Sequence, residues 1–349
     1  MRMRVDDDET SGAVPAISFA MSQGIKGGAL LLMVYHHCFG FRHCYVDVPA
    51  FFENGLLVQS ALTAKLCVAI FAFLTGWVYC HHRDKSYIYS LKKIVLFLAH
   101  YWVACAFCAI VAVVCCSWRP SLGDAARELF PNSSRPLMIF CWYVSFYVQM
   151  MLLFPILRLV ESHVSGGWSW LLMVVFSVVV VAASYYVPYC EHFVWFSYAA
   201  FGYCCARARF LELFVHRKRR YKVGALMGTG IFLLMTLMFR QEVSVAIIYM
   251  PRVLLFIACL LLLSVPLQSI GMMAVLSYLG KHSMNIWFVH SLFFCAISGP
   301  WMQKVFFICM NPLYIFCVVL IVSLLVSLLI TPVQKQLTKL LHALMPRFL

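Results

Sequence analysis

Residues 26–37 read KGGALLLMVYHH, an apolar run that starts with a lysine and ends with two histidines. In a helix, the eleven steps from Lys26 to His37 return both side chains to nearly the same face, roughly 16 Å apart along the axis. A charged side chain at mid-membrane depth costs about 2.5–3.5 kcal/mol, so such groups usually face a protein interior or a wet cavity. We therefore predict that this helix forms one wall of a reaction chamber inside a membrane bundle.

The composition around this run is that of an integral membrane protein. Of 349 residues, 64% are hydrophobic and 11% are charged, and the mean hydropathy is +0.89. The apolar runs are continuous and about twenty residues long, whereas the strands of an outer-membrane barrel would alternate apolar and polar residues over about ten. We predict an all-α fold, a polytopic transmembrane helix bundle of about ten helices, at 16–39, 60–80, 94–117, 137–157, 168–187, 191–207, 224–239, 252–268, 273–296 and 312–333.

The basic residues predict how this bundle is oriented. Most of the 27 Lys and Arg residues fall on the same side as the two termini, chiefly in loops 81–93 and 207–222. Cytoplasmic loops carry such an excess, so we predict that both termini lie inside. The expected organisation is a short disordered tail over 1–15, a membrane domain over 16–334 and a cytoplasmic tail over 335–349.

Neither the charge nor the cysteines indicate another kind of protein. The net charge of +14 follows from the basic loops, and no module that reads DNA or RNA is visible, so we expect the lipid bilayer and not nucleic acid as a partner. The 16 Cys residues lie mostly within apolar runs and show no metal-ligand spacing. We interpret them as small buried hydrophobic side chains and predict no metal site.

The two histidines at the end of the opening run are the first candidates for chemistry. Neutral imidazole can accept a proton near pH 7, so we predict that His37 acts as a general base on an attacking hydroxyl. His36 points about 80° away from the face shared by Lys26 and His37, and is predicted to support His37 or to pack. The simpler alternatives are a lysine that snorkels to the inner interface and a histidine that is hydrogen-bonded across helices.

The fourth predicted span carries a second group of candidates. It reads CWYVSFYVQMMLLFPILR, with Trp142, Tyr143 and Tyr147 about one turn apart and Arg158 near the inner side. These side chains could bind a donor or an acceptor. The alternative is an interfacial belt of aromatic residues.

A third group lies late in the chain, in LSYLGKHSMNIWFVHSLFF. Lys281, His282, Ser283 and Asn285 are expected to cluster at the start of a helix, with Ser283 as its cap, and His290 lies further into the span. These residues are further candidates for substrate binding, although His282 and His290 differ by about 80° of rotation and need not serve one site.

Several of these segments together resemble the bacterial integral-membrane acyltransferases known as acyltransferase family 3. The first helix of that family has a Lys or Arg, ten residues and then a His, and Lys26 and His37 match this spacing. The segments FAFLTGWVY, WYVSFYVQMMLLFPIL, FGYCCARAR and YLGKHSMNIWFVHSLFF resemble family segments in the family's order, from about residue 20 to 296. One departure is LKKIVLFLAHYW, where many members have an arginine-rich segment. Lys92 and Lys93 are the only basic candidates there for contact with the donor.

The resemblance implies an enzyme of the bacterial cytoplasmic membrane. Its donor substrate would be cytosolic acyl-CoA, with acetyl-CoA as the expected form and no bound cofactor, and its acceptor a hydroxyl of a surface or extracytoplasmic carbohydrate. Direct transfer with His37 as base and a covalent acyl-histidine relay both remain open. The alternative from another class is a transporter or flippase for lipid-linked sugars, although acidic residues are nearly absent from the spans, which disfavours ion coupling.

Overall fold

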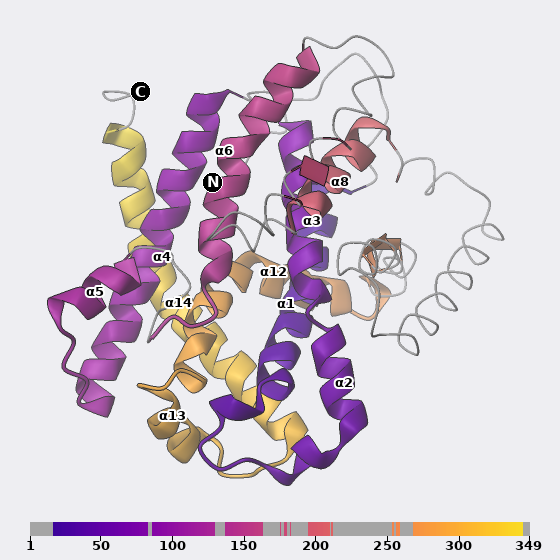
Figure 1. Cartoon of the computed structure of the whole chain (residues 1–349). Coiled ribbons are helices and arrows are strands. Elements are labelled where there is room, and N and C mark those ends of the chain that lie inside the picture. The colour runs from indigo at the N-terminus through magenta and orange to yellow at the C-terminus, as the bar shows by residue number, and fades with distance from the viewer. Residues whose placement is uncertain are drawn as a thin grey trace.

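The computed structural model describes residues 17–82, 86–129, 137–162, 195–209 and 268–344, with isolated positions between 163 and 267. Throughout this part of the chain the regular structure is helical, which confirms the predicted all-α bundle (Figure 1). The α-helices described are α1 (Phe19–Gly40), α2 (Gly55–Thr63), α3 (Leu66–His81), α4 (Tyr87–Cys116), α5 (Leu122–Leu129), α6 (Trp142–Ser162), α8 (Phe196–Arg207), α12 (Met272–Val289), α13 (Gly299–Phe306) and α14 (Pro312–Leu344). The predicted spans at 168–187, 224–239 and 252–268 lie outside the described residues, apart from isolated positions.

Long apolar helices support the membrane assignment. Within the described ranges, four helical segments are long and apolar enough to cross a membrane, namely Gly55–His81, Tyr87–Cys116, Trp142–Leu159 and Pro312–Leu344. Helix α1 is not among them, because polar side chains interrupt its apolar sequence. It lies near the middle of the bundle (Figure 1), where protein and not lipid surrounds most of its side chains.

Three segments differ from the predicted spans. The span at 60–80 is two helices, α2 and α3, which meet at Ala64 and Lys65. Helix α14 continues past residue 333 to Leu344, so much of the segment predicted as a tail is helical.

The third difference concerns Ser283. The prediction that Ser283 caps a helix is wrong, because α12 runs without interruption through residues 281–285. Its hydroxyl donates instead to the Gly280 carbonyl oxygen at 2.9 Å. The polar cluster therefore lies in the middle of a helix and not at its start.

Helices α1 and α12 pack at very short range. A Cβ atom on Gly27 would lie 1.9 Å from the carbonyl oxygen of Leu276, and one on Gly280 would lie 1.9 Å from that of Gln23. Small residues such as glycine allow membrane helices to approach this closely. Because α1 meets α12 at these glycines and again further along both helices, the two run in the same direction.

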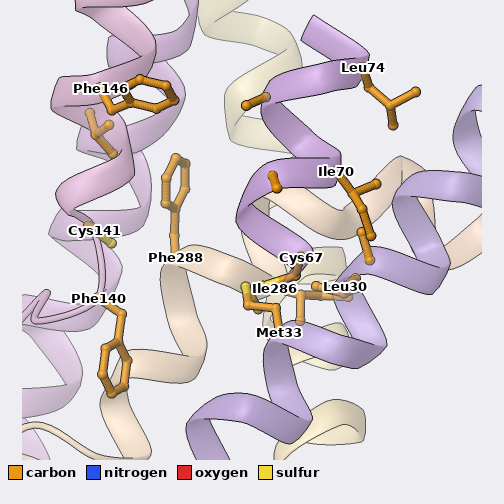
Figure 2. Close-up of a cluster of buried hydrophobic side chains, with 14 of the residues drawn as sticks. Leu30, Met33, Cys67, Ile70, Leu74, Phe140, Cys141, Phe146, Ile286 and Phe288 are labelled. Atoms are coloured by element: carbon orange, nitrogen blue, oxygen red, sulfur yellow. The ribbon is translucent and has the colours of Figure 1, made fainter. Parts of the chain in front are cut away.

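Helices α3 and α8 make a similar glycine contact. A Cβ on Gly76 would lie 1.8 Å from the Ala199 carbonyl oxygen, and one on Gly202 would lie 2.0 Å from the Phe73 carbonyl oxygen. Apolar side chains fill the space between these pairs and the neighbouring helices. Figure 2 shows this buried cluster, with Leu30 and Met33 from α1, Cys67, Ile70 and Leu74 from α3, Ile286 and Phe288 from α12, Phe146 from α6, and Phe140 and Cys141 just before α6.

Candidate active site

A cavity of about 500 Å³ lies between α1, α3, α6 and α12. Three lysines line it, Lys26, Lys65 and Lys281, and no acidic side chain of the described residues does. The rest of the lining is aromatic, apolar or uncharged polar: Gln23, Met33, His36, His37, Phe41, Cys67, Val68, Phe71, Thr75, Phe97, Phe140, Trp142, Tyr143, Tyr147, Gly280, Ser283, Met284 and Trp287. The cavity is thus mostly apolar but carries concentrated positive charge.

Lys26 and His37 both line this cavity, as their shared helical face predicts. Eleven residues of helix place them roughly 16 Å apart along α1. Lys281 belongs to the Lys26 end, because its neighbour Gly280 packs on Gln23 and Gly27 of α1. Within the described part of the chain, neither lysine has a hydrogen bond or an ion pair, so both ammonium groups are available to a ligand.

The other end of the cavity contains a pair of histidines. His37 Nδ1 lies 2.6 Å from Nε2 of His290, the residue that directly follows α12. Nδ1 of His290 in turn lies 2.5 Å from the carbonyl oxygen of Trp287. The sequence places His290 within a span but gives no indication that it meets His37.

A phenylalanine covers the histidine pair. The Phe140 ring lies 3.9 Å from the His37 ring, centroid to centroid, with 5° between the planes, and 5.4 Å from the His290 ring, with 9° between the planes. His37 is 7% exposed and His290 is fully buried. The His37 imidazole therefore faces the cavity, and the His290 imidazole lies behind that of His37.

His36 has a different role from His37. It also lines the cavity, but its Nδ1 lies 2.8 Å from the Ala61 carbonyl oxygen of α2. Tyr35 makes a second link to the same helix, through a 2.7 Å hydrogen bond between its hydroxyl and that of Ser60. His36 thus helps to hold α2 against α1, which agrees with the expected supporting or packing role.

The aromatic candidates of α6 lie on the cavity wall. Trp142, Tyr143 and Tyr147 all line it. The Tyr143 hydroxyl is buried and has no hydrogen bond of good geometry to the described residues, with Thr75 as its polar neighbour. It is a donor available to a bound substrate.

The late polar cluster is divided between two faces of α12. Lys281 and Ser283 line the cavity. His282 faces α14 instead, where its Nδ1 lies 2.9 Å from the Ser327 hydroxyl. Asn285 and Gln334 of α14 exchange two amide hydrogen bonds, of 2.7 and 2.8 Å. His282 and Asn285 therefore join helices and do not reach the cavity.

The basic candidates on α4 and α6 also lie off the cavity wall. Lys92, Lys93 and Arg158 are not among its lining residues. The Lys93 ammonium lies 5.4 Å from the centroid of the Tyr89 ring, close enough for a cation–π contact. The candidates for donor contact on α4 thus stand outside the cavity that holds Lys26.

The structure adds residues that the sequence did not single out. Lys65 lines the cavity one turn after Ala61, and its ammonium lies 5.5 Å from the centroid of the Trp195 ring. Trp287 contributes its side chain to the cavity and its carbonyl oxygen to His290. A charge inside an apolar run is the signal that could have drawn attention to Lys65.

The site is thus a histidine pair and several lysines around an internal cavity of an apolar helix bundle. The sequence profile of the acyltransferase domain, acyltransferase family 3, matches residues 22–332. The chain belongs to this family and is an acyltransferase, which confirms the resemblance based on motifs. Comparisons with curated proteins and with solved structures found no match.

Proposed function

We propose that this acyltransferase moves an acyl group, acetyl in the first instance, from cytosolic acyl-CoA to a hydroxyl of a surface or extracytoplasmic carbohydrate. The observation that carries the proposal is the cavity itself, which has Lys26 and Lys281 at one end, without ion pairs to the described residues, and His37 at the other. The positive-inside pattern of the loops supports a multi-pass protein of the bacterial cytoplasmic membrane with the Lys26 end towards the cytoplasm.

The charge of the cavity supports a polyanionic donor. Coenzyme A carries several phosphate charges, and lysines without nearby carboxylates attract phosphate as point charges. Lys26 and Lys281 lie at the end where the donor would enter. The acyl group on its long, uncharged arm would then reach along α1 towards His37.

The chemistry that we propose is direct transfer. Nε2 of His37 takes the proton of the acceptor hydroxyl, and the hydroxyl oxygen forms a bond to the thioester carbonyl carbon. The carbon–sulfur bond then breaks, and the departing thiolate takes the proton back from the His37 imidazolium. The Tyr143 hydroxyl is a suitable donor to the carbonyl oxygen, on which negative charge develops.

The test is transfer of a labelled acetyl group from acetyl-CoA in membranes that contain the protein. We expect His37→Ala to lower transfer by about 10²–10⁴-fold, the usual contribution of a positioned general base. A direct mechanism also predicts that no label stays on the protein when the acceptor is absent.

His100→Asn is the matched control. His100 is also a partly buried histidine that is hydrogen-bonded across helices, at 2.8 Å from the Thr338 hydroxyl, but it does not line the cavity. We expect this variant to keep its transfer activity. A folded His37→Ala protein with full activity would overturn the proposal.

A further inference from the structure

We propose that His290 is a positioning residue that holds His37 in the tautomer with its proton on Nδ1, so that Nε2 is the basic nitrogen. The inference rests on the proposed role of His37 as a general base and deepens it. It follows from two hydrogen bonds in series, from His37 to His290 and from His290 to the backbone of Trp287.

The proton positions in this series of hydrogen bonds can be assigned by starting at the Trp287 carbonyl. A carbonyl oxygen can only accept, so the 2.5 Å contact between Trp287 and Nδ1 of His290 requires a proton on that nitrogen. In a neutral imidazole the other nitrogen then carries a lone pair, and Nε2 of His290 is an acceptor. Nδ1 of His37, 2.6 Å away, must therefore be the donor. This leaves the lone pair of His37 on Nε2.

The ring geometry agrees with this assignment. The His37 and His290 planes are 4° apart and the centroids are 4.7 Å apart, while the bonded nitrogens are only 2.6 Å apart. Stacked rings could not bring two nitrogens so close, so the rings lie edge to edge in nearly one plane. The N–H of His37 thus points along the lone pair of His290, and Phe140 stacks on the His37 ring and lies parallel to the His290 ring.

The backbone of α12 fixes the position of His290. His290 directly follows the last residue of α12, and Trp287 provides one of the final carbonyl groups, which lack partners within a helix. Nδ1 of His290 satisfies this acceptor. Because His290 is fully buried and does not line the cavity, it acts on the reaction only through His37.

His290 takes the place that a carboxylate has beside the catalytic histidine of other enzymes. In a Ser-His-Asp triad, a buried Asp fixes the tautomer of the histidine and stabilises the imidazolium that forms. In the part of the chain that the structure describes, no acidic side chain lines this cavity. When His37 takes the acceptor proton on Nε2, its Nδ1–H still donates to His290, whose own proton remains on the Trp287 carbonyl. The positive charge on His37 is then stabilised by two neutral acceptors in series, Nε2 of His290 and the Trp287 carbonyl oxygen.

The test compares two replacements of His290. A glutamine offers a side-chain carbonyl that can accept from Nδ1 of His37, whereas a leucine of similar size offers no acceptor. We expect His290→Leu to lower kcat by about 100-fold with the KM for acetyl-CoA changed less than threefold, because Lys26 and Lys281 are untouched. We expect His290→Gln to recover at least a tenth of the wild-type kcat. Equal kcat values for the two variants, or a wild-type kcat in His290→Leu, would overturn the inference.

A spectroscopic readout separates this inference from the proposed function. Nitrogen-15 NMR of histidine-labelled protein distinguishes protonated from unprotonated ring nitrogens, and the His37 signals are those missing from His37→Ala. We expect Nδ1 of His37 to be protonated and Nε2 to be bare in the wild type, and this pattern to be lost in His290→Leu. A wild-type His37 protonated on Nε2 would overturn the inference even in an active enzyme. Absence of any acyl transfer would overturn the proposed function while this measurement still tests the histidine pair.

Discussion

At the scale of single residues, the position of Lys26 gives the clearest indication of ligand binding. It lines the cavity on the same helix face as His37, and the described residues offer it no hydrogen bond or ion pair. A lysine that only snorkelled to the interface would have no reason to border an internal cavity. Its position favours a role in binding the anionic donor.

Removal of this charge should therefore weaken donor binding and leave the chemical step nearly intact. We expect Lys26→Met to raise the KM for acetyl-CoA about tenfold, the equivalent of one lost charge-assisted contact, with little change in kcat. Lys339→Met is the matched control, because Lys339 is an exposed lysine of α14 outside the cavity. Initial rates at varied acetyl-CoA concentration measure both constants. An unchanged KM in Lys26→Met would count against a donor role.

The sequence predicts some of these residues and misses others for a physical reason. Helical phase within one segment is fixed by covalent geometry, so it correctly places Lys26 and His37 on one wall. The contact between His37 and His290 joins residues 253 positions apart and depends on which helices become neighbours. Helical phase shows towards which side of its own helix a side chain points, but it does not show which residue of another helix faces it.

At the scale of helices, the glycine contact between α1 and α12 sets the distance between the two halves of the site. Both helices carry one member of the histidine pair, and both carry a lysine at the other end of the cavity. Gly27 and Gly280 let the two backbones touch. Small residues allow such close packing in membranes, where water does not drive helices together.

A methyl group at either glycine should force these helices apart. We expect Gly27→Ala and Gly280→Ala each to lower the free energy of unfolding by about 1–3 kcal/mol, the usual cost of overpacking. Gly55→Ala is the control, since a Cβ there meets nothing within 4 Å. Thermal unfolding of the purified protein measures the difference. Equal stability of the Gly27→Ala and Gly55→Ala proteins would contradict the packing argument.

Helix boundaries in the polar segments could not be predicted from the sequence. Ser and Asn often mark a helix start in water, because their side-chain oxygens accept hydrogen bonds from the free N–H groups there. In α12 the same residues lie in the middle of the helix, since Lys281 and Ser283 face the cavity while His282 and Asn285 bind to α14. From sequence alone, polar residues that form hydrogen bonds between helices inside a bundle cannot be distinguished from residues that cap a helix.

At the scale of the whole molecule, the cavity carries a net positive charge from side chains of several helices. Among the described residues, three lysines and no carboxylate line it, and the basic loops add to the same field. The 64% hydrophobic composition predicts a membrane protein, and the continuous apolar runs of about twenty residues predict the all-α class. The cavity is a property of the assembled helices, and composition does not describe its aromatic and apolar walls.

The central claim is that the protein acylates a carbohydrate with His37 as the general base and that the bundle does not itself export the carbohydrate. Mass spectrometry of surface glycans tests this most directly, in cells that produce the wild-type protein or His37→Ala at equal levels. We predict that the acyl groups disappear from the glycan in His37→Ala cells while the amount of glycan stays the same. Glycans that keep their acyl groups in these cells, or that disappear altogether, would contradict the account.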